Sequence, residues 1–306
     1  MSRDVDMTVE LAGIRMRNPV MAASGTFGYG PEYADYVDLN RLGAIVVKGI
    51  RMQPCDGNRP PRTVEVPGGL INAIGLQGPG AAGFVERYMP FLRQYDVPVI
   101  VNIWGTTIEE YGEVAAFFDD VEGVHGLELN ISCPNIKEGG IAFGTDPQSA
   151  ARVIAAVRKR TRLPLIPKLS PNVTSVAVFA RIAEAEGADA VSLINTLPAM
   201  VIDTATRRPV LSNVVGGLSG PGIRAVAVKQ VWEAAGAVSI PVIGLGGITS
   251  GRDAAEFMIA GAAAVAVGTA SFTDPDATLR VIDELEDYAA GQGLARIADL
   301  TGSLEV

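Results

Sequence analysis

The sequence predicts a (β/α)8 barrel whose floor is closed by an N-terminal β-hairpin. Eight short apolar runs recur along the chain, segments with helical spacing separate them, and polar residues gather at the last positions of the runs. Parallel strands covered on both faces read as near-continuous apolar runs, and their regular alternation with helices is typical of such a barrel. A doubly wound open sheet is the main alternative, but eight evenly distributed units favour closure.

Eight apolar runs are predicted to form the strands of the barrel. They cover residues 19–24, 44–49, 97–104, 126–132, 163–170, 190–195, 240–247 and 263–270. Two of the intervening segments, 149–161 and 175–187, place apolar residues on one face of a helix, namely Val153, Ile154 and Val157 in the first and Val176, Phe179, Ile182 and Ala183 in the second.

The remaining segments complete the predicted architecture. Residues Thr8 to Met16 alternate around Gly13 and are expected to form the hairpin at the barrel floor. Two connections, 50–96 and 196–239, are long enough to be functional covers. Because no linker or shift in composition divides the chain, residues 1–306 are expected to form a single domain.

Composition excludes several classes of protein. The chain has 306 residues, 48% of them hydrophobic, and a net charge of −9, so we expect a large core and no binding to nucleic acid. No apolar signal segment opens the sequence and no apolar stretch is long enough to span a membrane, so we expect no membrane association. The two cysteines, Cys55 and Cys133, are too far apart in sequence to suggest a metal or redox motif, which fits a reducing cytoplasm.

Proton transfer in this chain cannot depend on histidine in the usual way. The single histidine, His125, precedes the fourth strand on the rim opposite the strand ends and is expected to be structural. Acid–base chemistry must therefore rest on another side chain, such as cysteine or lysine.

Polar residues end five consecutive predicted strands. They are Lys48, Asn102, Asn130, Lys168 and Asn195. The carboxyl ends of barrel strands converge on one face, where active sites form, and buried amide and ammonium groups need partners. A polar, planar small molecule would supply those partners.

The last two strands end differently, in Gly246-Gly247 and Gly268-Thr269. Glycines let the backbone approach a ligand closely, and the corresponding loops of such barrels commonly bind phosphate. The pattern predicts a phosphorylated cofactor at one end of the site and a polar small molecule at the other.

Taken together, the motifs of this sequence resemble those of the dihydroorotate dehydrogenases over nearly the whole chain. The motifs that match are NAIGLQGPG (72–80), NISCPNIKEGG (130–140), IPKLSPN (166–172), GGLSGPGI (216–223) and IGLGGI (243–248). The resemblance implies an FMN-bearing barrel that oxidises (S)-dihydroorotate to orotate in the synthesis of pyrimidines.

The sequence also favours one branch of that family. The membrane-associated branch has serine where this chain has Cys133, and it has an extra N-terminal segment. The stretch from Ser132 to Pro147 is most similar to the cytosolic, NAD-linked branch (class 1B), which implies a partner subunit with FAD and a 2Fe–2S cluster, two of each subunit assembling together. The alternatives are the fumarate-linked branch (class 1A) and a flavoenzyme related to dihydropyrimidine dehydrogenase, although two cysteines cannot hold a cluster in this chain alone.

The resemblance implies roles for individual residues. The positions that match flavin contacts are Ser24, Lys48, Gly49, Asn102, Asn130, Lys168, Ile194, Gly220, Gly246, Gly247, Gly268 and Thr269. The positions that match contacts to the pyrimidine are Lys48, Asn72, Ala73, Ile74, Gly75, Leu76, Asn130, Asn135, Asn195 and Thr196.

Chemistry suggests how the most reactive of these residues would act. Cys133 matches the catalytic base that removes the proton from C5 while the hydride leaves C6 for flavin N5. Asparagines suit the substrate because their side chains both donate and accept hydrogen bonds. Lys168 is expected at the N1–O2 edge of the flavin, where its charge would stabilise the reduced form, and Lys48 is expected between flavin and substrate. No metal ion is expected in the site.

Two other functions stay open from the residues alone. Lys48 or Lys168 could form a Schiff base in an aldolase or lyase built on the same barrel. The chain could also be a non-catalytic module that binds a phosphorylated ligand, which would leave the five polar strand ends without an explanation.

Overall fold

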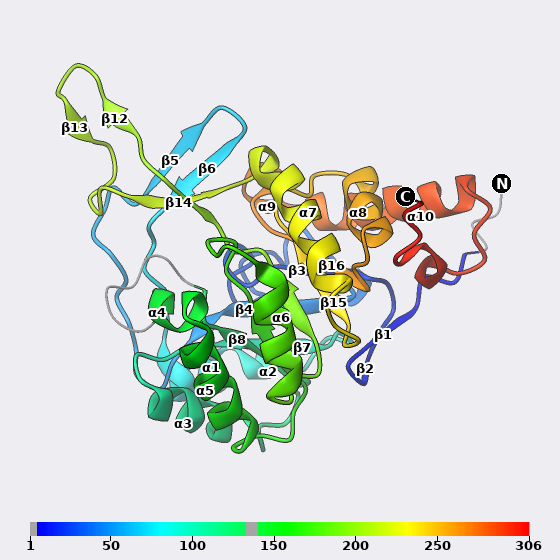
Figure 1. Ribbon diagram of the computed structural model, residues 1–306, viewed down its shortest axis with the longest axis horizontal. Helices are drawn as coiled ribbons and strands as arrows, with labels where there is room; N and C mark the ends of the chain where they lie inside the picture. Colours follow the sequence, from blue (N-terminus) through cyan, green and yellow to red (C-terminus); the bar gives the residue numbers. More distant parts are fainter. Residues whose placement is uncertain (1–4, 133–139, 306) are drawn as a thin grey trace.

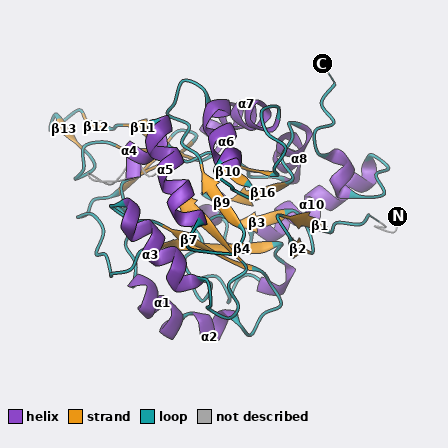
Figure 2. Cartoon of the chain, turned by 60° about the horizontal axis from the view of Figure 1, so that its bottom comes forward, coloured by secondary structure: helices purple, strands orange, loops and turns teal. Residues whose placement is uncertain are grey.

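A closed barrel of eight parallel strands forms the centre of the described chain (Figures 1 and 2). The computed structural model describes residues 5–132 and 140–305. The barrel strands are β3 (Val20–Ala22), β4 (Ala44–Ile50), β7 (Val99–Ile103), β8 (Gly126–Asn130), β9 (Leu165–Lys168), β10 (Val191–Leu193), β15 (Val242–Leu245) and β16 (Ala264–Val267). Each lies within or overlaps one of the eight predicted runs, and the predicted barrel is confirmed.

Helices follow most barrel strands and surround the sheet (Figure 2). They are α1 (Gly80–Arg87), α2 (Met89–Leu92), α3 (Ile108–Phe118), α4 (Gly140–Thr145), α5 (Pro147–Arg158), α6 (Val176–Ala185), α7 (Arg224–Ala235), α8 (Gly251–Ile259), α9 (Ala270–Thr273) and α10 (Ala277–Gly291), with 3-10 turns at Leu39–Arg41, Pro221–Ile223 and Ile297–Leu300.

The start of α5 shows how local sequence sets a helix boundary. The Asp146 side chain accepts a hydrogen bond from the backbone N–H of Ser149, and Pro147 occupies the first turn, where a missing N–H does no harm. The predicted stripe of Val153, Ile154 and Val157 is buried, as expected.

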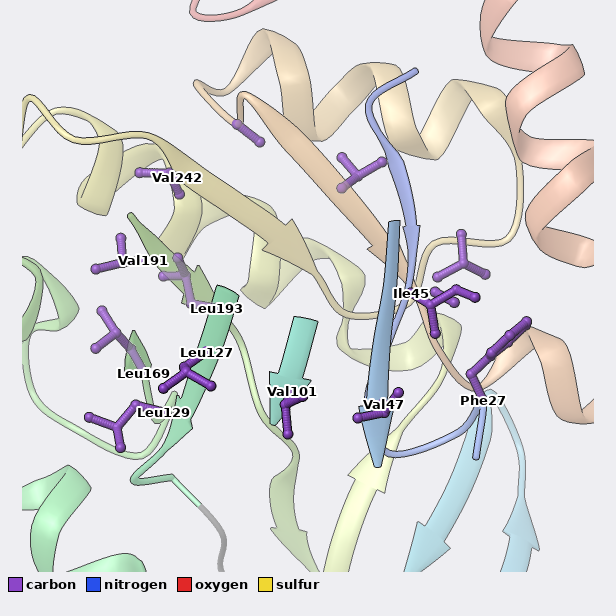
Figure 3. Packing of buried hydrophobic residues seen from close by; sticks show 14 of the residues in the cluster. Phe27, Ile45, Val47, Val101, Leu127, Leu129, Leu169, Val191, Leu193 and Val242 are labelled. Atoms are coloured by element: carbon purple, nitrogen blue, oxygen red, sulfur yellow. The ribbon is translucent and has the colours of Figure 1, made fainter. Parts of the chain in front are cut away.

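Apolar side chains fill two layers, one on each side of the barrel wall. The outer layer packs beneath the helices and includes Val47, Val101, Leu127 and Leu193 (Figure 3). Val47, Val101 and Leu127 are also direct neighbours in register across β4, β7 and β8, so one band of apolar residues continues from strand to strand.

The inner layer is completed by the N-terminal hairpin. Strands β1 (Val9–Leu11) and β2 (Ile14–Met16) pair antiparallel, and both turn residues, Ala12 and Gly13, have positive φ, at 51° and 81°. Leu11, Ile14 and Met16 belong to the same apolar cluster as the inward-facing residues of the barrel strands. The predicted hairpin at the floor is therefore present.

The two long connections form a sheet together. Strands β5 (Thr63–Val66) and β6 (Gly69–Asn72) come from the first connection, and β11 (Leu197–Ala199) and β14 (Gly216–Ser219) come from the second. They pair in the order β11-β14-β6-β5, and a further hairpin of β12 (Ile202–Asp203) and β13 (Arg208–Pro209) projects beyond them (Figure 1). This sheet brings Asn72 beside Gly217, 145 residues away in sequence.

No helix in the described part of the chain is both long and apolar enough to cross a membrane.

Candidate active site

A cavity lies at the carboxyl ends of the barrel strands, where the sequence predicted a site. All twelve positions predicted to contact a flavin line it, from Ser24 after β3 to Thr269 after β16. Of the positions predicted to contact a pyrimidine, the cavity is lined by Lys48, Asn72, Ile74, Gly75, Leu76, Asn130, Asn195 and Thr196. Cys133 and Asn135 lie outside the described residues.

Ala73 is the exception among the described candidates. Its side chain is 1% exposed and packs with Ile71 and Leu211 in a small apolar cluster of the added sheet. Its backbone N–H donates to the Arg62 carbonyl, so Ala73 holds the strand in place and does not line the cavity. Ala73 follows Asn72, the last residue of β6, and its side chain packs in the apolar cluster whereas Asn72 lines the cavity.

Sequence reasoning also missed residues that line the cavity. Thr26, Ser219, Ile223 and Phe272 are among them. Ser219 accepts a hydrogen bond from the Thr269 hydroxyl at 2.8 Å, which ties the end of β14 to the loop after β16. The motif GGLSGPGI contains Ser219 and Ile223 and was the available signal for both.

A β-bulge directs Lys48 toward the cavity. Between the paired positions Val47↔Val101 and Ile50↔Ile103, two residues of β4 oppose the single residue Asn102. Lys48 also donates its backbone N–H to the Gly28 carbonyl outside the sheet. Bulges of this kind are frequent beside active sites because they re-aim side chains.

The next two strands place asparagines in contact with each other. The amide of Asn130 donates to the side-chain oxygen of Asn102 at 3.3 Å, and Tyr111 donates its hydroxyl to the Asn130 carbonyl at 2.7 Å. Both asparagines are buried, at 1% and 6% exposed for Asn102 and Asn130. Their side chains are therefore held in fixed positions at the base of the cavity.

Asn195 and Thr196 close another side of the cavity. The Asn195 amide donates to the Ser132 hydroxyl at 2.9 Å, and its oxygen accepts the backbone N–H of Thr196 at 2.8 Å. The hydroxyl of Thr196 is buried and has no hydrogen-bond partner within residues 5–132 and 140–305. An unsatisfied buried hydroxyl is unfavourable, so this group is available to a ligand.

Lys168 is a buried charged residue that also lacks a partner among the described residues. The residue is 7% exposed, lines the cavity, and forms no hydrogen bond or ion pair with any described residue. On β9 it is paired in register with Asn130 on β8 and with Ser192 on β10. An unpaired ammonium group in such a place is costly unless a negatively charged ligand compensates it.

Three glycine-containing segments converge opposite the asparagines. Gly220, Gly246 and Gly247 have positive φ, at 100°, 130° and 84°. A Cβ on Gly247 would lie 2.8 Å from the Gly220 carbonyl oxygen, so only glycine fits there. Together with Gly268 and Thr269 they line one end of the cavity with backbone, as a phosphate site requires.

The ammonium group of Lys48 is destabilised in the folded protein. Burial lowers its pKa, and the neighbouring charge of Arg62 lowers it further. Between this lowered pKa and the ordinary value of 10.5, the unfolded chain binds more protons than the folded chain, so stability rises with pH across that window.

We expect Lys48→Met to raise the free energy of unfolding of the ligand-free protein at neutral pH. The gain should be at most about 1 kcal/mol, because water still screens this partly exposed group. The gain should diminish as the pH approaches 10.5 and Lys48 loses its proton in both states. Urea unfolding at several pH values measures this, with Lys229→Met as the control because Lys229 is exposed and paired with Glu233. A Lys48→Met protein less stable than the wild type at neutral pH would contradict the expectation.

His125 lies at the other end of the strands. It precedes β8, and its Nδ1 accepts the backbone N–H of Val99 at the start of β7 at 3.1 Å. It does not line the cavity. This position agrees with the structural role expected from the sequence.

Comparison with known proteins decides the family. The family model described as dihydroorotate dehydrogenase matches residues 6–288. The chain belongs to the dihydroorotate dehydrogenase family. Among its relatives are proteins of Geobacter sp. (strain M21) and Citrifermentans bemidjiense, each 57% identical over 301 residues, which cover 98% of this chain and 99% of the relative. A protein of Pelobacter propionicus is 56% identical over 300 residues, again 98% of this chain and 99% of the relative.

These relatives also indicate the branch of the dihydroorotate dehydrogenases. All three are named dihydroorotate dehydrogenase B (NAD(+)), catalytic subunit. The family and the NAD-linked branch that the motifs predicted are thereby confirmed.

Proposed function

We propose that this chain catalyses the FMN-dependent oxidation of dihydroorotate to orotate, as the catalytic subunit of an NAD-linked enzyme of pyrimidine synthesis. Family membership and the names of the relatives support the reaction. The observation that carries the proposal is the cavity itself, in which two lysines and four asparagines meet a glycine-lined end.

The chemistry of the cavity fits FMN. Lys168 supplies an unpaired positive charge, and the segments around Gly220, Gly247 and Thr269 supply close backbone for a phosphate. The remaining predicted contacts would hold the ring system, namely Ser24, Lys48, Gly49, Asn102, Asn130, Ile194, Gly246 and Gly268. When bound, FMN would supply the acceptor for the hydride from C6 of the substrate.

The substrate would be held by amide groups. Dihydroorotate is a small ring with several amide donors and acceptors, and Asn72, Asn130 and Asn195 present both kinds of group around the cavity. Thr196 and the 74–76 segment would complete the contacts, and Asn135 is proposed to join them from outside the described residues. Lys48 would lie between substrate and cofactor.

Cys133 is proposed as the general base. It follows Ser132 directly, and the described contacts of Ser132 lead into the asparagine groups: its backbone N–H donates to the Asn130 side chain and its hydroxyl accepts from Asn195. The single histidine lies at the far end of the strands, so the base must be another kind of residue. A thiolate at this place would remove the proton from C5.

The reaction is tested with protein loaded with FMN and kept free of oxygen. We expect the yellow protein to lose its colour when dihydroorotate is added, and to regain it when an electron acceptor follows. Protein that binds no FMN, or that stays yellow with dihydroorotate, would refute the proposal.

The phosphate end of the site has its own test. Gly247→Ala should weaken FMN binding by about tenfold or more, because a left-handed backbone disfavours alanine by about 1–2 kcal/mol and the new methyl group displaces the Gly220 carbonyl. Titration of apoprotein with FMN measures the affinity. Gly291→Ala is the matched control, since nothing lies within 4 Å of a Cβ there. Equal affinities of the two variants for FMN would argue against this position of the phosphate.

A partner subunit with FAD and a 2Fe–2S cluster is proposed to pass the electrons to NAD, in an assembly of two of each subunit. The words catalytic subunit and NAD(+) in the names of the relatives support it, as does the presence of only two cysteines in this chain. The isolated chain should reduce artificial dyes but reduce NAD poorly. Efficient reduction of NAD by the chain alone would overturn this proposal.

Two further proposals concern the whole chain. We propose that residues 1–306 act as one domain, supported by backbone hydrogen bonds that join Asp6 to Ala295 and Ile297 near the two ends. We propose a cytoplasmic location because the sequence has only two cysteines, which fits a reducing compartment.

A further inference from the structure

Glu128 is a buried carboxylate directly beneath the cavity. It lies on β8 two residues before Asn130, it is 4% exposed, and it does not line the cavity itself. No ion pair joins it to any described residue. Burial of a carboxylate without a countercharge is costly, so a function for the group is expected.

Both carboxylate oxygens accept hydrogen bonds from other barrel strands, one from the adjacent strand β7 and one from β10, which lies beyond β9. Oε2 accepts from the amide of Asn102 on β7 at 2.6 Å, and Oε1 accepts from the hydroxyl of Ser192 on β10 at 2.8 Å. Asn102 and Ser192 are 1% and 0% exposed, so water does not compete for these bonds.

The hydrogen bonds continue from Glu128 into the predicted site. The NH₂ group of Asn102 donates to Glu128. The side-chain oxygen of Asn102 therefore accepts, and its donor is the amide of Asn130 at 3.3 Å. The oxygen of Asn130 then accepts the backbone N–H of Ser132 at 3.4 Å. The series ends one residue before Cys133.

An ionised carboxylate can only accept hydrogen bonds, whereas an asparagine amide can turn over and exchange its donor for its acceptor. Because Glu128 accepts from Asn102, the Asn102 amide is held in one orientation. The oxygen of Asn102 then holds the Asn130 amide in one orientation in the same way. A reversed Asn102 would place its NH₂ group against the NH₂ group of Asn130.

We propose that Glu128 is a positioning residue, which fixes the direction of the Asn102 and Asn130 amides so that each presents the correct donor or acceptor to the ligands in the cavity. The proposal rests on the proposed function, since the ligand used to test it is the product, orotate. It assigns to Glu128 no contact with substrate and no transfer of a proton.

Three variants separate this role from a structural one. Glu128→Met keeps the length of the side chain and removes both acceptors. Glu128→Gln keeps one acceptor oxygen for Asn102 and removes the charge. Ser192→Ala removes the other hydrogen bond of the same carboxylate and leaves the bond to Asn102 in place.

Binding of orotate to the FMN-loaded proteins is followed through the flavin absorbance, and the folding stability of each protein is measured in urea. We expect Glu128→Met to weaken orotate binding by roughly 10- to 100-fold, because a donor left unpaired or facing another donor is unfavourable. We expect Glu128→Gln and Ser192→Ala to bind orotate within about threefold of the wild type. The KM for dihydroorotate should follow the same order.

The results that would overturn the proposal are distinct. If folded Glu128→Met binds orotate with the affinity of the wild type, the Asn102 and Asn130 amides do not need Glu128 to fix their orientation. An equal loss in Glu128→Gln and Glu128→Met would assign the effect to the charge and not to the acceptor. Failure of the wild-type protein to bind orotate would instead refute the proposed function.

A second pair of variants keeps the proposal testable if Glu128→Met does not fold. Asn102→Asp places two acceptors against each other, whereas Asn102→Asp combined with Glu128→Gln restores a donor–acceptor pair at unchanged formal charge. The double variant should bind orotate at least about tenfold more tightly than Asn102→Asp alone. No recovery in the double variant would refute the proposal.

Discussion

Replacing Cys133 by alanine should slow the reduction of bound FMN by dihydroorotate about 10²- to 10⁴-fold at neutral pH. This is the usual contribution of a positioned general base, and no histidine lies in the cavity to take over the role. The measurement is the rate of colour loss after rapid mixing without oxygen. Binding of orotate should change little, because the proton is removed only in the chemical step.

Cys55 provides the matched control for this experiment. It is the other cysteine of the chain, half-buried in the connection after β4, with its thiol 3.7 Å from the Gly75 carbonyl. In Cys55→Ala, dihydroorotate should reduce the bound flavin at a rate within about twofold of the wild type, since no proton transfer is assigned to Cys55. A Cys133→Ala protein that loses its colour at the normal rate would defeat the role of Cys133.

Lys168→Met should lower kcat about 10²- to 10³-fold, the range found when one preorganised charge or donor at a developing negative charge is removed. Lys168 is buried and unpaired among the described residues, so its positive charge is not neutralised by the protein and is available at the cavity. Steady-state kinetics with an artificial dye measure the loss. FMN affinity, measured on the apoprotein, should fall in the same variant.

Lys229→Met serves as the control for Lys168. Its side chain is 62% exposed and pairs with Glu233 on the surface of α7, so activity should be unchanged. Normal turnover in Lys168→Met would show that negative charge develops elsewhere in the site. Because methionine has nearly the length of lysine, a loss of activity without a loss of folding stability reports the charge and not the packing.

The barrel could be predicted because its signals are local. Each barrel strand is a short, near-continuous apolar run, and a helix such as α5 repeats its apolar residues at a spacing of about 3.6, so both signals are visible within a few residues. The polar residues at the strand ends were equally visible. Once the barrel is closed, its geometry alone brings Lys48 and Asn195, 147 positions apart, to one cavity.

Other features of the site could not be predicted because they depend on pairs of distant residues. Glu128 stood inside an apolar run, and nothing nearby in sequence shows that Asn102 and Ser192 would meet its two oxygens. The bulge at Lys48 is a mismatch between two strands and is invisible in either strand alone. Ala73 was placed in the site by its neighbours, whereas the pairing of β6 with β14 turns it away.

The barrel, its hairpin floor, the face that carries the site and the family motifs are all visible in short segments of the sequence, because periodicity and strand-end chemistry are local properties. Which polar groups satisfy one another, and which are left for a ligand, depends on how distant segments pack. Glu128 and Asn102 are paired, while Lys168 and the Thr196 hydroxyl find no partner in the described chain. The physical reason is that a hydrogen bond needs its two groups within about 3 Å, and closure of the barrel sets those distances.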